Sequence, residues 1–358
     1  MAGRQDTRRR FEQWVKNPSC EANVISAVAG VGMAAVAKSE GLEPSIGQSP
    51  FALARGQTFE KALLENNGER LLAALIEKGA LPDGAKGLAD LRIRMNGGPL
   101  KSLDEAAAKT SELLRAAAVA GPDGLYSTTP AIISSATLEI PGQPVMLPDG
   151  KLAIDALLLR PSEGGTAVEL VIGEIKTYPY RAGHTDSAEL ATARGQAGVY
   201  LHALRLSIDA LGLSESFVCS PSGVLVMSLS GQNAPVVLPN EDLEFQAARA
   251  SRGFGRLREA AAGVTEFDIS DEALGIAKVT AASTEYKPEC ISFCDRAVGC
   301  RRAAESAGDA VVLGADVKRL LGETTLARAA DLLDGAEPTS LRESELAARF
   351  QDGRGEVS

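Results

Sequence analysis

The sequence predicts an α/β fold in which a sheet is flanked by helices. Two apolar runs typical of buried strands, residues 151–159 (KLAIDALLL) and 167–178 (AVELVIGEIKTY), are joined by a Gly-Gly turn and predict a β-hairpin. Apolar residues at helical spacing precede the hairpin at 49–76 and 102–120, and a further helical pattern follows it around 196–200. Strands that lie between helices in this way are typical of an α/β domain.

The composition is that of an ordinary globular protein, with 358 residues, 45% of them hydrophobic and 23% charged. The charged start of the chain is not a signal peptide, and the apolar run 24–37 is too short and too rich in Gly and Ala to cross a bilayer. We therefore expect a cytosolic protein without a membrane segment and without structural disulfides. The net charge of −10 argues against a broadly basic nucleic-acid binder but leaves room for a local basic groove.

Three charged residues interrupt the two apolar strands: Asp155 in the first, Glu174 and Lys176 in the second. A charge in a buried strand is costly unless it is paired or bound to metal. Side chains alternate along a strand, so Glu174 and Lys176 share one face, and pairing of the strands brings Asp155 close to Glu174. Two adjacent carboxylates repel each other unless a divalent cation separates them, and oxygen ligands suit Mg²⁺ or Mn²⁺. A lysine beside such a cation can position water and stabilise charge on a phosphate.

The helix after the hairpin carries Gln196 and Tyr200, which are four residues apart and so lie on one helix face. Together with the hairpin they resemble the core motifs of the PD-(D/E)XK nucleases, in the RecB-like branch of that family: Asp155, the triplet Glu174-Ile175-Lys176 and Gln196-x-x-x-Tyr200. The resemblance implies a restriction-endonuclease-like core, a central mixed sheet flanked by helices.

The same resemblance implies a metal-dependent nuclease in which Asp155 and Glu174 bind Mg²⁺ or Mn²⁺. The carbonyl of Ile175 would be a further ligand, and Lys176 would orient the attacking water. The Gln and the Tyr of the motif line the site and help to place the DNA strand. The acidic-x-Lys pattern alone is not specific, since it recurs at residues 285–287 and 316–318, and the alternative is a hairpin with a surface salt bridge.

In the predicted helix 49–76, Gly56 precedes Glu60 by four positions. This is similar to a RecB-family signature in which a Gly precedes a His by the same distance, so Glu60 stands at the His position. A glutamate can bind the same hard metal. It can equally be an ordinary helix-surface residue, and the sequence leaves both readings open.

Three of the five cysteines, Cys290, Cys294 and Cys300, fall within eleven residues. Clustered cysteines in a cytosolic protein indicate a metal, either zinc or an iron–sulfur cluster. No second close pair and no nearby His completes a zinc motif, so a fourth ligand must come from elsewhere in the chain.

The order of the cysteines resembles the iron–sulfur module of some RecB-like nucleases, among them the AddB type and the CRISPR-adaptation exonucleases. These place one Cys before the nuclease core and three after it, around a [4Fe–4S] cluster whose main role is to pin the ends of the fold. Cys20 and the trio match that order, with Cys219 as the fallback fourth ligand. The three-residue gap between Cys290 and Cys294 departs from the family, which usually has two.

These patterns divide the chain into an N-terminal helical region with the first cluster cysteine (1–130), a nuclease core (131–240), a C-terminal helical and iron–sulfur region (241–337) and a flexible tail (338–358). Within the third region, a helix is predicted from Asn240, as N-cap, to Ala262. It carries four arginines, which suit either the edge of a DNA groove or a solvated helix face: Arg249, Arg252, Arg256 and Arg258.

The sequence thus predicts a Mg²⁺- or Mn²⁺-dependent deoxyribonuclease, an exonuclease rather than an endonuclease, with a structural [4Fe–4S] cluster. By resemblance, its substrate is single-stranded DNA or DNA ends, and its setting is DNA repair, CRISPR adaptation or phage defence, with protein partners in such a complex. The first alternative is a nuclease-like iron–sulfur module that holds DNA or protein without cutting. The second is an iron–sulfur redox protein, against which the lack of a flavin or nicotinamide fingerprint counts.

Overall fold

The computed structural model describes residues 7–43, 50–141, 150–181, 183–229, 234–264 and 271–355. The chain folds into two compact units, which we call the sheet unit (residues 48–263) and the cysteine unit (residues 9–47 and 264–358), with short segments at the start of the chain divided between them. The predicted N-terminal region, 1–130, is therefore split between the two units.

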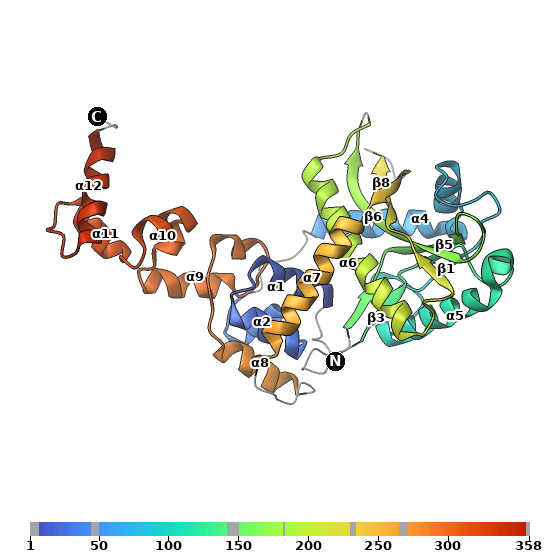
Figure 1. The fold of residues 1–358 in the computed structure, drawn as a ribbon, viewed down its shortest axis with the longest axis horizontal. Helices are drawn as coiled ribbons and strands as arrows, with labels where there is room; N and C mark the ends of the chain where they lie inside the picture. The colour runs from blue at the N-terminus through green and yellow to red at the C-terminus, as the bar shows by residue number, and fades with distance from the viewer. Residues whose placement is uncertain are drawn as a thin grey trace. The chain divides into compact units, whose positions relative to one another are not determined.

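The sheet unit contains a mixed sheet in the order β1-β2-β5-β6-β8-β9, with β7 also paired to β6 (Figure 1). Its strands are β1 (Leu88–Asp90), β2 (Ile132–Ser134), β5 (Ala156–Pro161), β6 (Val168–Tyr180), β7 (Phe217–Cys219), β8 (Ser222–Leu229) and β9 (Pro235–Asp242). Strands β7 and β8 run parallel to β6, whereas β5 runs antiparallel to it. The expected α/β class with a mixed central sheet flanked by helices is confirmed.

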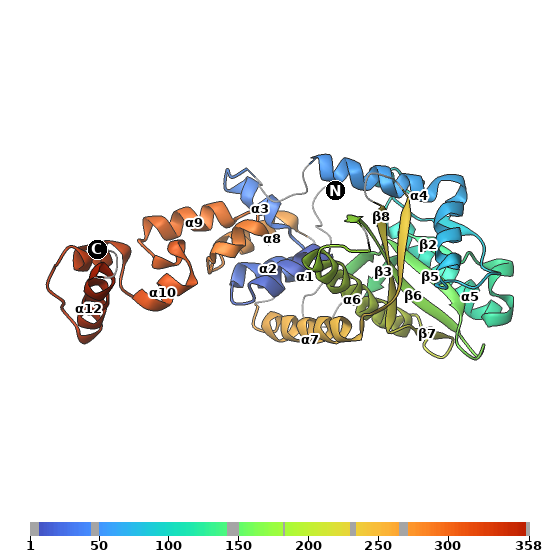
Figure 2. The same ribbon diagram turned by 90° about the horizontal axis from the view of Figure 1, so that it is seen from above.

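Helices cover both faces of this sheet: α4 (Pro50–Glu77) lies on one side, and α6 (Ser187–Ala210) and α7 (Glu244–Ala261) lie on the other (Figure 2). A further helix, α5 (Leu103–Thr128), packs against β3, β5 and β6. Its N-cap is Ser102, whose hydroxyl accepts a hydrogen bond from the Glu105 amide, as the Ser-x-x-Glu sequence at 102–105 predicts. A short 3₁₀ turn, η1 (Arg94–Asn96), precedes α5.

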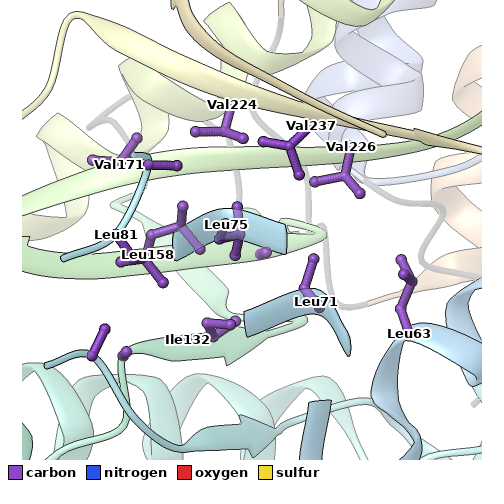
Figure 3. Close-up of a cluster of buried hydrophobic side chains, with 14 of the residues drawn as sticks. Leu63, Leu71, Leu75, Leu81, Ile132, Leu158, Val171, Val224, Val226 and Val237 are labelled. Carbon is purple, nitrogen blue, oxygen red and sulfur yellow. The ribbon is translucent and has the colours of Figure 1, made fainter. Parts of the chain in front are cut away.

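The core between α4 and the sheet is formed by apolar side chains from both (Figure 3). It includes Leu63, Leu71 and Leu75 of α4 and, from the sheet, Ile132, Leu158, Val171, Val224, Val226 and Val237. The side chain of Ile175 packs against the same cluster. Because side chains alternate along β6, Glu174 and Lys176 point to the opposite face, which α6 covers.

The predicted long helix at 49–76 is present as α4, but it is broken between Glu65 and Gly68. Asn66, Asn67 and Gly68 all have positive φ, which asparagine and glycine tolerate better than other residues. A side chain at Gly68 would also collide with Leu88 on β1. The apolar spacing across 63–76 is therefore shared by two helical segments.

Three strand and cap predictions were wrong. Residues 151–159 form two strands, β4 (Gly150–Ala153), which pairs with β3 (Thr137–Ile140) in a separate two-stranded sheet, and β5. The apolar pattern of residues 214–229, with its turn sequence at 220–223, predicts a second hairpin, but these residues instead supply β7 and β8, which follow one another along β6. Asn240 is not a helix cap, because β9 continues to Asp242 and α7 starts at Glu244.

The cysteine unit is helical in the residues that the structure describes. Its elements are α1 (Thr7–Lys16), α2 (Glu21–Ala29), α3 (Met33–Ser39), α8 (Glu272–Ala281), η2 (Pro288–Ser292), α9 (Ala297–Ser306), η3 (Ala310–Leu313), α10 (Ala315–Leu321), α11 (Leu326–Leu333) and α12 (Leu341–Gly355). The predicted flexible tail is mostly helix α12, because Leu346 is buried against a small apolar cluster with Ala329 and Leu332. No helix in the described ranges is long and apolar enough to cross a membrane.

Close contact between α6 and α7 requires a glycine at position 198. A Cβ atom there would lie 2.7 Å from the carbonyl carbon of Gln246 and 2.9 Å from the nitrogen of Ala247. We expect Gly198→Ala to lower the free energy of unfolding by about 1–3 kcal/mol, because the two helices must separate to admit the methyl group. Urea unfolding followed by circular dichroism measures this.

Gly195, on the same helix, is the matched control, because a Cβ atom there meets nothing within 4 Å. Gly195→Ala should leave stability unchanged or raise it by up to about 1 kcal/mol, since alanine favours helix. Equal destabilisation by both substitutions would contradict the close packing of α6 on α7.

Candidate functional site

The hairpin formed by β5 and β6 gathers the predicted acidic residues. Ala156 stands opposite Gly173 in the antiparallel register, so Asp155 is placed next to Glu174 at the end of β5, as expected. Asp155 lies where the chain passes from β4 to β5, and its carbonyl accepts a hydrogen bond from the amide of Ser135 (3.0 Å). The break between the two strands therefore places Asp155 just before the start of β5, an inner strand of the main sheet.

Lys176 lies between the two carboxylates. Its ammonium group contacts the carboxylate of Glu174 and is 3.9 Å from Oδ2 of Asp155. Oδ2 of Asp155 also accepts a hydrogen bond from the Ile175 amide (2.9 Å), so the backbone of the triplet holds the aspartate in place. Glu174 is fully buried, whereas Asp155 and Lys176 keep side-chain exposures of 31% and 20%. Solvent thus reaches the site from the Asp155 and Lys176 side.

Glu60, on α4, lies within electrostatic reach of Asp155. Burial raises the pKa of Glu60 to about 7, Arg92 opposes the rise, and Asp155 and Asp90 add to it. The structure therefore brings Glu60, a half-buried residue, to the Asp155 end of the site. That Glu60 binds a metal stays a prediction.

Two residues that the sequence did not single out, Asp90 and Arg92, complete this end of the site. Asp90 ends β1, and its carboxylate accepts hydrogen bonds from Nε and Nη2 of Arg92 (3.0 and 2.8 Å) and from the Arg92 amide (3.0 Å). They come near Asp155 through the pairing of β1 with β2 and of β2 with β5. No local pattern reveals this, since it depends on the order of strands in the sheet.

Helix α6 brings polar residues to the sheet face that carries Glu174 and Lys176. Nε2 of Gln196 donates a hydrogen bond to Oη of Tyr200 (2.8 Å), so the two residues of the predicted pair do lie together. In the first turn of the helix, Glu189 lies near Tyr178 at the end of β6. Burial raises the pKa of Tyr178, Glu189 and Glu174 add to the rise, and Lys176 opposes it. The sequence did not single out Tyr178 either, because its contact with Glu189 depends on where α6 starts.

The carboxylates have the chemistry that a hard divalent cation needs. Asp155 and Glu174 both face one cationic group, the Lys176 ammonium, and Glu60 adds a third oxygen donor near Asp155. Among the described residues, however, no three His, Cys, Asp or Glu side chains are grouped closely enough to hold a metal ion. The carboxylates thus match a hard cation in charge and donor type but are not grouped closely enough to hold one, and Asp155 and Glu174 converge on Lys176.

A second constellation lies in the cysteine unit, where four cysteines line one cavity of about 20 Å³. They are Cys20 at the start of α2, Cys290 in η2, Cys294 after it and Cys300 in α9. All four are free thiols, and all but Cys300 are buried. The structure thus places Cys20 with the trio.

Burial raises the pKa of the Cys294 thiol to about 12 and also raises the pKa values of Cys290 and Cys300, and the neighbouring thiols add to each shift. Cys20 is among the neighbours that raise the pKa of each of the other three thiols. Cys219, the fallback ligand, belongs to β7 in the sheet unit, where burial raises its pKa to about 11 and Arg205 is its charged neighbour. Four sulfur donors around one cavity suit iron–sulfur or zinc chemistry in donor type.

Around the cysteine cavity, hydrogen bonds and an ion pair join segments that are far apart in the sequence. The Asn17 side-chain amide donates to the carbonyl of Glu285 (2.7 Å) and to Sγ of Cys290 (3.5 Å). Arg296, between Cys294 and Cys300, forms a two-pronged ion pair with Glu40 (2.9 and 2.5 Å) and donates to the carbonyls of Val279 and Thr280.

Comparison of the chain with models of protein families, with curated proteins and with solved structures finds no match.

Because the Arg296–Glu40 pair is largely shielded from water, we expect Arg296→Lys to lower the free energy of unfolding of the cysteine unit by about 2 kcal/mol. Lysine keeps the charge but loses the planar fork that serves the carboxylate and two carbonyls. Urea unfolding under reducing conditions measures the change. Arg301→Lys is the control, because its pair with Glu305 is exposed, and should change stability by less than about 0.5 kcal/mol. Equal effects would show that the Arg296 contacts carry no special stability.

Proposed function

We propose that this protein is a metal-dependent DNA nuclease with a RecB-like PD-(D/E)XK core. The observation that carries the proposal is the meeting of Asp155, Glu174 and Lys176 at one end of a paired hairpin in a mixed sheet. Support comes from Glu60, which lies near Asp155, and from the Gln196–Tyr200 pair on the helix that covers the same face of the sheet. The substrate is single-stranded DNA or a DNA end.

In this proposal Asp155 and Glu174 hold Mg²⁺ or Mn²⁺, with Glu60 and the Ile175 carbonyl as further oxygen ligands. The cation, when bound, lowers the pKa of a water molecule and offsets negative charge on the phosphate. Lys176 donates hydrogen bonds to the attacking water and holds it in line with the phosphorus atom. The Ile175 amide keeps the Asp155 carboxylate oriented through its 2.9 Å hydrogen bond, so the ligand geometry is set before substrate arrives.

The second part of the proposal is a [4Fe–4S] cluster held by Cys20, Cys290, Cys294 and Cys300 in the cysteine unit. Its support is that the four thiols line one cavity although Cys20 is 270 residues before Cys290. A bond network between such distant segments stabilises the folded chain by restricting the unfolded one. The cluster is therefore structural, tying α2 to η2 and α9.

Digestion of end-labelled single-stranded DNA tests the nuclease. Anaerobically purified protein should cut with Mn²⁺ or Mg²⁺ and not with chelator, and Lys176→Ala should lower the rate by about two orders of magnitude or more. Because Glu174 is buried against Lys176, the folding of this variant must be checked by thermal unfolding. Asp155→Asn is a second test, because it changes a partly exposed residue, hardly alters its shape and leaves no buried charge without a partner. This variant should also lose activity.

Lys318→Ala is the matched control, because Lys318 belongs to another acidic-x-Lys sequence, in α10, and should leave the rate unchanged. Cutting that survives both Lys176→Ala and Asp155→Asn would show that the activity belongs to another site or another protein. A folded protein that binds DNA but never cuts it would favour the alternative, a non-catalytic nuclease-like module.

Metal analysis of the same preparation tests the cluster. We expect iron and acid-labile sulfide at about four atoms of each per chain, lost in Cys20→Ser and retained in Cys219→Ser. Loss of the cluster should also lower the thermal unfolding temperature, because the ends of the cysteine unit are no longer joined. Zinc in place of iron, or loss of iron in Cys219→Ser instead of Cys20→Ser, would contradict the assignment.

A further inference from the structure

Helix α7 presents an aromatic side chain and three arginines in one row. Counting about 100° per residue, Phe245, Arg249, Arg252 and Arg256 fall within an arc of about 60°. The residues that α7 buries lie on the other side of the helix: Ala247, Ala250, Leu257 and Ala261. We call the exposed row, formed by Phe245, Arg249, Arg252 and Arg256, the arginine row.

The arginine row carries three positive charges, and two acids close to it offset part of them. All three arginines are exposed, and the described part of the chain supplies no ion pair to any of them. Two acids near the start of the helix are already engaged by arginines of α6, Glu241 by Arg194 (2.5 Å) and Glu244 by Arg205 (2.6 Å). Two other acids, Asp242 before the helix and Glu259 near its end, remain close to the row.

The aromatic end of the row, Phe245, is largely exposed to solvent. Phe245 has 66% of its surface exposed and lies at the first turn of α7, in line with the three arginines. A single exposed apolar side chain is common on protein surfaces, and what sets Phe245 apart is the place of its ring beside the arginines. An aromatic face beside arginines suits a base stacked on the ring and phosphates on the guanidinium groups.

The row belongs to the same rigid part of the molecule as the candidate site. Gly198 of α6 packs directly against Gln246 and Ala247 of α7, and α6 also carries Gln196 and Tyr200. The rings of His202 and Phe254 add a contact between the two helices (5.4 Å between centroids). A strand held on α7 is therefore held at a fixed distance from α6.

We infer that the arginine row is a binding surface for single-stranded DNA, with Phe245 stacking on a base and the arginines contacting successive phosphates. Successive arginines rise by about 4.5 to 6 Å along the helix, which suits contacts to neighbouring phosphates of one strand rather than to a single anion. A single strand is favoured over a duplex because only unpaired bases offer a free face to Phe245. The choice of DNA as ligand rests on the proposed function, while the surface itself does not.

Equilibrium binding of fluorescent single-stranded DNA across a range of salt concentrations tests the inference. Chelator and Lys176→Ala are used throughout, so that no cutting occurs. Replacing Arg249, Arg252 and Arg256 together with Ala should weaken binding about a hundredfold at low salt. It should also reduce the slope of log K against log salt by about 2, since each lost phosphate contact to a single strand accounts for about 0.7.

Phe245→Ala separates stacking from charge. It should weaken binding of single-stranded DNA about tenfold with no change in the salt slope and no effect on duplex binding. The control is Lys101, Lys109 and Arg115 changed together to Ala, which removes the same charge from exposed positions at and along α5. This control should shift binding far less than the arginine variant.

Unchanged affinity in the arginine variant, or an equal loss in the control, would overturn the inference. Equal weakening of single-stranded and duplex DNA by Phe245→Ala would overturn the stacking role. The inference and the proposed nuclease fail separately: wild-type protein that binds through the row but does not cut with Mn²⁺ or Mg²⁺ refutes the nuclease alone. Protein that cuts but binds independently of the row refutes the inference alone.

Discussion

The arrangement of the sheet unit depends on how a fully buried carboxylate is compensated. Glu174 lies on a central strand with no solvent contact, and burying its charge without a partner would cost several kcal/mol. Lys176, two residues along the same strand and on the same face, supplies that partner, and Asp155 shares its ammonium from the neighbouring strand. A buried ion pair of this kind is weak evidence for stability, because an apolar pair can hold the strands as well, and it marks this position as a candidate functional site.

The geometry around this pair follows from the backbone more than from the side chains. Gly173 allows close approach of β5, since a Cβ atom there would lie 3.1 Å from the Cβ of Ala156, and that approach sets Asp155 beside the triplet. On the other edge, β8 runs parallel to β6 past Glu174 and Lys176, so the acidic strand is enclosed on both sides. The site is thus held by strand pairing, with only Asp155 left at a strand end where solvent enters.

The sequence predicted features that depend on local residue patterns, and it did not predict features that depend on the order of the strands in the sheet. The hairpin, the position of Asp155 next to Glu174 and the shared helix face of Gln196 and Tyr200 were predicted from spacing and residue type. The gathering of Cys20 with the trio was predicted from the resemblance to the iron–sulfur nucleases. The parallel course of β7 and β8 was missed because a short apolar strand does not reveal its partner. Asn240 misled for a related reason: asparagine is favoured at helix N-caps, but here it has a positive φ within β9, a conformation that asparagine also tolerates. The helical tail was missed because its apolar face is small and its partners lie in three other short elements, η3, α10 and α11.

The carboxylate at position 60 changes the electrostatics of the site in a way that a histidine would not. A neutral imidazole adds no charge, whereas Glu60 adds a third acid beside Asp155 and Asp90, and burial together with these neighbours raises its pKa to about 7. Arg92 opposes that rise, and its guanidinium is held in place by two hydrogen bonds to Asp90. The oriented arginine next to Glu60 therefore offsets part of the negative charge that the glutamate adds. Arg92 belongs to the site for this reason, and Asp90 belongs to it because its carboxylate orients Arg92, although neither residue matches a motif.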